Sequence, residues 1–294
     1  RGNIISYQLE KKPDLNKKLT IDPSLIFSTY SGSYVPNWGF TATHDLGTNT
    51  YSGGTAFDAL VTDTFPITPG AFQISWGGGP GADFDIEFTD NVIMKYDNTG
   101  QLLFSTFLGG YGGERPHSLT INNKNELIIL GTTNATDFPV TAGAFDTSGN
   151  GNWDIYVSKL SSDGAQLIAS TYIGGSENDG VNIDNDYNTR RSLKFNYADD
   201  SRGDISVDEN FNIYIASCTK SADFPTTTYA YQKTFSPNGG HSLFITYGCV
   251  GRGEGVGACG GARECSYADS SAAASQARYV HPAARKLIAD SAQC

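Results

Sequence analysis

The chain is poor in the residues on which several protein classes depend. Only 17% of its 294 residues are charged, and it contains one Met and three Trp. Lys and Arg number 20 against 31 Asp and Glu, which gives a net charge of −11. Binding along a nucleic-acid backbone needs clustered basic residues that displace counterions. The composition therefore argues against a nucleic-acid partner.

Long apolar runs and distributed cysteines are missing as well. No apolar run approaches the roughly 20 residues that a membrane-spanning helix requires, so we expect no membrane span. Four of the five cysteines fall in the last 47 residues, which leaves Cys218 alone in the rest of the chain. A disulfide framework places cysteine pairs throughout a domain. Disulfides therefore do not staple the body of the chain, and the pairing of the other four cysteines stays open.

Glycine and aromatic residues are abundant, with 34 Gly, 16 Tyr and 16 Phe. This composition suits short strands and tight turns. One phrase, Ser-Thr-Tyr or Ser-Thr-Phe followed by glycine, occurs at residues 27–32, 104–110 and 169–175. A strand-like phrase that recurs at this spacing is typical of a modular β architecture in which each copy builds one unit.

Each copy of the phrase opens a unit with four strand-like stretches. The units cover residues 25–101, 102–166 and 167–247. Alternating apolar and polar residues, with turn residues between them, predict twelve strands in all. The predicted strands are 25–32, 38–45, 50–57, 91–97, 102–109, 116–122, 126–133, 154–161, 167–174, 204–208, 212–219 and 242–247. Four strands are the blade size of a β-propeller.

A second recurring phrase precedes the fourth strand of each unit. It begins with Phe-Pro and covers residues 65–72, 138–145 and 224–231. Proline fixes φ and removes a backbone donor, so this phrase does not fit a central strand. We expect a structured crossing loop, which its aromatic residues can anchor to the sheet.

Together these phrases resemble the SBBP-type β-propeller repeats of secreted and surface proteins, especially those of Bacteroidota. The resemblance rests on the Ser-Thr phrase, on Asp137 to Phe145, on Asp154 to Leu160 and on the Asp163-Gly164 turn. It covers about residues 25–247. It implies an all-β array of about three four-stranded propeller-type blades, which is partial or open because a closed ring has four to eight.

The resemblance also implies a larger context. Residues 1–24 are expected to be the end of a preceding β domain or a linker, and other blades of a longer chain are expected partners. The localisation implied is secreted or at the cell surface, with the leader absent from this chain. Residues 248–294 contain 11 Ala and no Asn, Phe or Trp. This tail is foreign in composition, either a linker with a helix near 269–289 or an artefact such as a shifted reading frame.

One acidic insert of the third unit could bind a metal. Asp184, Asp186 and Asn188 present oxygen ligands at alternate positions, and Asp179 lies just before them. Hard cations such as Ca²⁺ prefer oxygen ligands. The prediction is therefore a possible Ca²⁺ loop, with a solvated acidic turn as the alternative; no other cofactor is indicated.

Trp76 is the candidate ligand-binding residue, because it stands among Gly77, Gly78 and Gly79 and an aromatic face can stack on a sugar. The sequence indicates no catalytic residue. The function expected from the resemblance is a non-catalytic scaffold for adhesion, with a protein or carbohydrate ligand at its loops. The alternative is a polysaccharide-active propeller enzyme, a hydrolase or lyase, that uses carboxylates of the insert loops.

Overall fold

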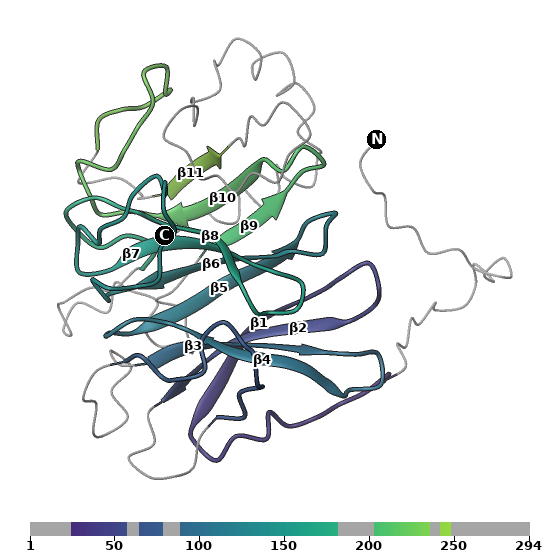
Figure 1. The fold of residues 1–294 in the computed structure, drawn as a ribbon. Helices are drawn as coiled ribbons and strands as arrows, with labels where there is room; N and C mark the ends of the chain where they lie inside the picture. The colour runs from purple at the N-terminus through teal and green to yellow at the C-terminus, as the bar shows by residue number, and fades with distance from the viewer. Residues whose placement is uncertain (1–24, 58–64, 79–88, 182–202, 236–241, 248–294) are drawn as a thin grey trace, which may run out of the picture.

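A computed structural model describes residues 25–57, 65–78, 89–181, 203–235 and 242–247. Within these residues the chain is all-β, with three antiparallel sheets and no helix (Figure 1). The predicted fold class is confirmed at this level. None of the described residues forms a helix of the length and apolarity that crossing a membrane requires.

The three sheets follow one another along the chain, and neighbouring strands pair in chain order. Sheet 1 contains β1 (Asn37–His44), β2 (Thr50–Phe57), β3 (Thr89–Tyr96) and β4 (Leu102–Leu108). Sheet 2 contains β5 (Glu114–Ile121), β6 (Leu127–Thr133), β7 (Asp154–Leu160) and β8 (Leu167–Ile173). Sheet 3 contains β9 (Asp204–Val207), β10 (Ile213–Cys218) and β11 (Ser242–Tyr247).

The grouping of strands into sheets differs from the prediction by one strand. The Ser-Thr phrase lies in β4 and β8, and each of these strands completes the preceding sheet instead of opening the next. The first copy, in residues 25–32, was predicted as a strand, but it has no strand partner and forms none. Each sequence unit therefore contributes strands to two sheets. This is possible because a segment of given sequence can pair with a strand on either of its two edges.

The sheets stack face to face (Figure 1). Clusters of buried apolar side chains fill the space between sheets 1 and 2 and between sheets 2 and 3. In β6, Leu127 and Ile129 face sheet 1, whereas Ile128 and Leu130 face sheet 3. This alternation follows from the two-residue period of a strand. Sheet 2 thus has both faces buried, and a third cluster, which includes Val92 of β3, covers the face of sheet 1 that points away from sheet 2.

The first strands of successive sheets lie beside one another. β5 packs against β1 on one side and against β9 on the other. The short segment 109–113 leads the chain from the last strand of sheet 1 to the first strand of sheet 2. The chain therefore repeats one path, in which it fills a sheet from first strand to last and then begins the next sheet.

The phrase that begins with Phe-Pro forms a loop along the edge of each complete sheet, as predicted. In sheet 1, Thr68 Oγ1 accepts a hydrogen bond from Ser105 N–H (3.0 Å), and Thr68 N–H donates to the Ser105 carbonyl (3.1 Å). In sheet 2, Thr141 and Ser170 make the same two hydrogen bonds, 3.0 and 3.1 Å long. We call residues 65–73, 138–146 and 224–232 the edge loops.

Candidate functional site

Buried carboxylates gather between the sheets at two equivalent places. Asp90 and Glu114 form the first pair, between sheets 1 and 2, and Asp154 and Asp179 form the second, between sheets 2 and 3. Asp90 and Asp154 occupy equivalent positions in β3 and β7. Glu114 and Asp179 each follow a Gly-Gly step by the same number of residues. We call these the inter-sheet carboxylate pairs.

The first pair receives hydrogen bonds from the backbone and from side chains. Asp90 Oδ2 accepts from Gly77 N–H (2.8 Å) and from Gln73 Nε2 (3.3 Å). Glu114 Oε1 accepts from Thr133 Oγ1 (2.6 Å). Asp90 and Glu114 have no exposed surface, and Glu114 Oε2 finds no hydrogen-bond partner among the described residues.

The second pair repeats this arrangement. Asp154 Oδ2 accepts a hydrogen bond from Asn150 N–H (2.8 Å). Asp179 Oδ2 accepts from Gly175 N–H (2.7 Å) and from Ser221 Oγ (2.8 Å). The Oδ1 atoms of Asp154 and Asp179 are buried and unpartnered within the described part of the chain. One oxygen of Asp90, Asp154 and Asp179 thus binds the backbone of a loop, whereas Glu114 binds the side chain of Thr133 in β6.

Glycine is required beside each inter-sheet carboxylate pair, directly after the strand that contains the Ser-Thr phrase. A Cβ on Gly109 would lie 2.5 Å from Glu114 Oε2 and 2.8 Å from an oxygen of Asp90. A Cβ on Gly174 would lie 3.1 Å from Asp179 Oδ2 and closer still to Asp154 Oδ1. These distances are shorter than normal contacts, so the glycines of the Ser-Thr phrase make room for the carboxylates.

Burial changes the acidity of both pairs. Desolvation raises the pKa of Glu114 well above its ordinary value, and the negative charge of Asp90 raises it further. Burial raises the pKa of Asp154 to about 6, and the charge of Asp179 adds to this effect. Burial also raises the pKa of Asp179, although hydrogen bonds from Gly175 and Ser221 oppose the increase. These carboxyl groups therefore keep their protons to higher pH than exposed ones do.

The first hairpin of every sheet closes with one kind of turn. An Asp or Asn at its start accepts two backbone N–H hydrogen bonds within the turn, as an Asx residue does. Asp45 accepts from Gly47 and Asn49, Asn122 from Lys124 and Glu126, and Asp208 from Asn210 and Asn212. A residue with positive φ follows in each turn, namely Thr48, Asn125 and Phe211.

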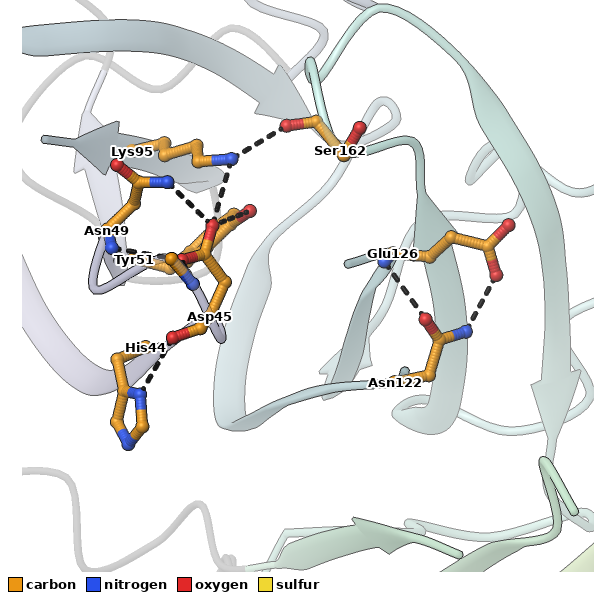
Figure 2. Close-up of polar contacts among 9 residues, drawn as sticks. His44, Asp45, Asn49, Tyr51, Lys95, Asn122, Glu126 and Ser162 are labelled. Carbon is orange, nitrogen blue, oxygen red and sulfur yellow. Dashed lines mark hydrogen bonds and ion pairs between the residues drawn. The ribbon is translucent and has the colours of Figure 1, made fainter. Parts of the chain in front are cut away.

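Lysines connect two of these turns to the third strand of their sheet. Figure 2 shows the first of them, Lys95. Lys95 Nζ lies 3.2 Å from Asp45 Oδ2 and donates a hydrogen bond to the carbonyl of Ser162 in sheet 2 (3.1 Å). At the equivalent position Lys159 Nζ lies 3.3 Å from Glu126 Oε2. Lys95 and Asp45 are buried, whereas Lys159 and Glu126 are partly exposed.

The pKa of Asp45 reflects opposing effects. Burial alone would raise it, but hydrogen bonds from Asn49 and the nearby ammonium of Lys95 outweigh burial, and the pKa lies below its ordinary value. Asp208 shows the same direction, because hydrogen bonds from Asn212 and from Tyr214 outweigh its burial. Asp45 and Asp208 thus stay ionised to lower pH than ordinary carboxyl groups, in contrast to Glu114, Asp154 and Asp179, whose pKa values are raised.

The predicted Ca²⁺ ligands fall largely outside the described residues. Asp184, Asp186 and Asn188 lie there, so the Ca²⁺ loop stays a prediction. Asp179 is described, but it is fully buried and holds the backbone of Gly175. The described residues contain no group of three or more His, Cys, Asp or Glu side chains placed to hold a metal ion.

Trp76, the predicted ligand-binding residue, packs against the apolar cluster on the outer face of sheet 1. Its Nε1 is buried and has no hydrogen-bond partner among the described residues. Trp38 is the more exposed of the two side chains, at 38%, and its ring meets Phe57 edge to face. The side chain of Trp153 is buried under the guanidinium of Arg115. Sugar stacking at Trp76 therefore stays a prediction.

The inter-sheet carboxylate pairs were not predicted, although the sequence contains a signal for them. An acidic residue follows the first glycine of the Gly-Gly step by five positions in both Gly109 to Glu114 and Gly174 to Asp179. A second acid stands in or at the start of the third strand, at Asp90 and Asp154. The sequence does not show how the sheets stack, and this stacking brings the two acids of a pair together.

Comparison with known proteins assigns the chain to no family. No protein-family model matches it, and no curated protein is significantly similar in sequence. The fold and its contacts define a class, an all-β protein made of stacked antiparallel sheets with repeated turns and repeated buried acids.

Proposed function

We propose that the chain is a non-catalytic β-propeller-type repeat scaffold, secreted or at the cell surface, that binds a protein or carbohydrate ligand through its loops. The propeller arrangement is supported by the face-to-face stacking of the sheets and by the contacts of β5 with both β1 and β9. The localisation rests on the resemblance of the recurring phrases to SBBP-type repeats.

One observation supports the scaffold over the enzyme: the polar chemistry is repeated. A catalytic acid pair is needed once, whereas the inter-sheet carboxylate pairs occur in two equivalent copies and hold backbone N–H groups. The first-hairpin turns occur in three copies, each with its donors paired. Repetition and burial are expected of groups that build the architecture.

The proposal is tested by offering the chain a panel of polysaccharides and measuring binding and reducing-end release together. We expect binding to one class of polysaccharide without product. A measurable release of reducing ends would contradict the scaffold and favour the polysaccharide-active enzyme.

Two variants show whether any product depends on the buried acids. Glu114→Gln and Asp154→Asn each remove one carboxylate from a different pair while keeping nearly the same shape. A scaffold predicts unchanged ligand binding for both variants, whereas catalysis by one pair predicts that only one substitution stops product release. Circular dichroism of each variant confirms that the fold is kept.

A further inference from the structure

Among the described residues sheet 3 has one strand fewer than sheets 1 and 2, and one copy of the phrase that forms the fourth strand elsewhere pairs with no strand. In sheets 1 and 2 the Ser-Thr phrase is the fourth strand, in β4 and β8. In sheet 3 the last strand is β11, whose one neighbour among the described strands is β10. The remaining copy, residues 25–32, pairs with no strand.

The edge loop of sheet 3 already has the shape that receives a fourth strand. Ala230 N–H donates to the Thr227 carbonyl (3.1 Å), as Ala71 and Ala144 donate to Thr68 and Thr141 in the other two loops (3.3 and 3.1 Å). Gln232 Nε2 donates to the Thr234 carbonyl at 3.1 Å, which repeats the 3.0 Å hydrogen bond of Gln73 with Ser75.

What this loop lacks is its partner. Thr68 and Thr141 each bind the backbone of the phrase serine, Ser105 or Ser170. Among the described residues, the N–H and Oγ1 of Thr227 have no hydrogen-bond partner.

Among the described residues Gln232, five residues further along the same edge loop, also lacks the partner that its equivalent Gln73 has. Gln73 N–H donates to Thr106 Oγ1 (3.0 Å), and the Gln73 carbonyl accepts from Phe107 N–H (3.1 Å). In the described part of the chain the backbone N–H and carbonyl of Gln232 have no such contacts.

Residues 25–31 already have the local geometry of the fourth strand. Thr29 Oγ1 donates to the carbonyl of the next residue, Tyr30, at 3.1 Å. Thr106 and Thr171 make the same hydrogen bond in β4 and β8, both at 2.9 Å. Yet Tyr30 is 96% exposed, whereas the equivalent aromatic side chains Phe107 and Tyr172 are buried.

The segment also lies on sheet 1 as β4 lies on sheet 2. A Cβ on Gly100 would come within 2.9 Å of the Phe27 ring, and a Cβ on Gly164 would come within 2.5 Å of the Phe104 ring. Phe27 and Phe104 are equivalent positions of the phrase. A sheet completed by residues 25–31 would therefore stack on sheet 1 as sheet 1 stacks on sheet 2.

We propose that residues 25–31 of one copy of this chain add to β11 of a second copy as the fourth strand of its sheet 3. The register follows from β3 and β4, where Met94 pairs with Ser105 and Lys95 with Phe104. By equivalence Ile245 pairs with Ser28. Thr227 of the receiving copy binds the Ser28 backbone, and Gln232 binds that of Tyr30.

The addition is reciprocal, because each copy has both residues 25–31 without a strand partner and, among its described strands, a β11 that pairs on one side only. Two copies joined twice place six sheets in one assembly, within the four to eight of closed propellers. The expected species is a symmetric dimer, of twice the 31.5 kDa chain mass.

Analytical ultracentrifugation of the full chain over a range of concentrations tests this. We expect a dimer, and Tyr30→Ala should weaken it by about 10-fold or more in dissociation constant, because a buried aromatic anchor is lost. Thr227→Ala should weaken it as well. Tyr34→Ala is the matched control, since Tyr34 is also highly exposed but lies outside the phrase. Tyr30 is exposed in the monomer, so its loss should not impair folding.

Cysteine cross-linking tests the register. In a background with Ser at Cys249, Cys259, Cys265 and Cys294, Ser28→Cys and Ile245→Cys chains are mixed. We expect an intermolecular cross-link between them and none for Tyr34→Cys mixed with Ile245→Cys. A monomer at every concentration would overturn the proposal. So would a dimer that Tyr30→Ala and Thr227→Ala leave unchanged, or a 28–245 cross-link within one chain carrying both cysteines.

Discussion

Sheets 2 and 3 are built from equivalent residues but differ in completeness. Sheet 2 has four strands and apolar side chains on both faces. Sheet 3 has three described strands, and its face toward sheet 2 carries Ile205 and Ile215. Equivalent strands therefore form a layer with both faces buried in sheet 2 and, among the described residues, a layer of three strands in sheet 3. The stability of a position in this fold should depend on its neighbours more than on its own residue.

The largest expected difference concerns one apolar position in the two sheets. Ile129 of β6 and Ile215 of β10 are equivalent, and both face the preceding sheet. We expect Ile129→Ala to lower the free energy of unfolding by about 3 to 5 kcal/mol, because two complete sheets prevent the cavity from collapsing.

For Ile215→Ala we expect about 2 to 3 kcal/mol, because a three-stranded layer can relax around the cavity. Chemical denaturation of both variants measures the two losses. Equal losses of unfolding free energy would show that the number of strands in the sheet does not control how much the substitution destabilises the fold.

The second prediction concerns pH and the carboxylate pair between sheets 2 and 3. The pKa of Asp154 is about 6 in the folded chain against an ordinary value of 3.8, so the unfolded chain binds fewer protons between these values. The stability contributed by this group is complete below the ordinary pKa and falls as pH rises through about 6. From about pH 4 to pH 7.5, the wild type should lose on the order of 2 to 3 kcal/mol relative to Asp154→Asn.

Denaturation at both pH values measures this difference, with Asp97→Asn as the control. The pKa of Asp97 lies below its ordinary value because of hydrogen bonds from Thr99 and Gln101, so this group titrates at lower pH. Asp97→Asn should therefore keep the wild-type dependence in this range. If Asp154→Asn keeps it too, burial of Asp154 does not set the pH response.

The smallest expected effect compares Lys95, which Figure 2 shows, with Lys159 at the equivalent position. Lys95→Met leaves the buried Asp45 with its hydrogen bonds from Gly47 and Asn49 but without its cation, which should cost about 2 kcal/mol. Lys159→Met removes a partly exposed ion pair, for which we expect less than about 1 kcal/mol. Thermal and chemical unfolding of both variants gives the comparison. A larger loss for Lys159→Met would mean that burial of the pair does not determine its contribution.

Much of the local structure could be predicted from residue patterns. Strands Thr50–Phe57 and Ser242–Tyr247 match the prediction at both ends, because turn residues bound their apolar alternation. Residues 25–32 were predicted as a strand from the same residue pattern. They do not form a strand, since a strand needs a partner and none of the described strands pairs with them. The residue pattern identifies the segments that can form a strand, and the neighbouring strands decide whether a segment forms one.

The carboxylate pairs could not be predicted for a related reason. Asp90 and Glu114 belong to different sheets, and their separation depends on how the sheets stack. The turn residues Asp45, Asn122 and Asp208 act within a few positions of themselves, so turn chemistry was readable from the sequence. Long-range pairs require the assembled layers.

The offset between sequence repeat and sheet has a practical consequence. β4 opens the second repeat but is hydrogen-bonded to β3 of the first. A backbone cut just before Leu102 would separate the repeats covalently while leaving this strand ladder intact. The two halves should then reassemble when expressed separately, which makes this junction a natural point for fragment complementation.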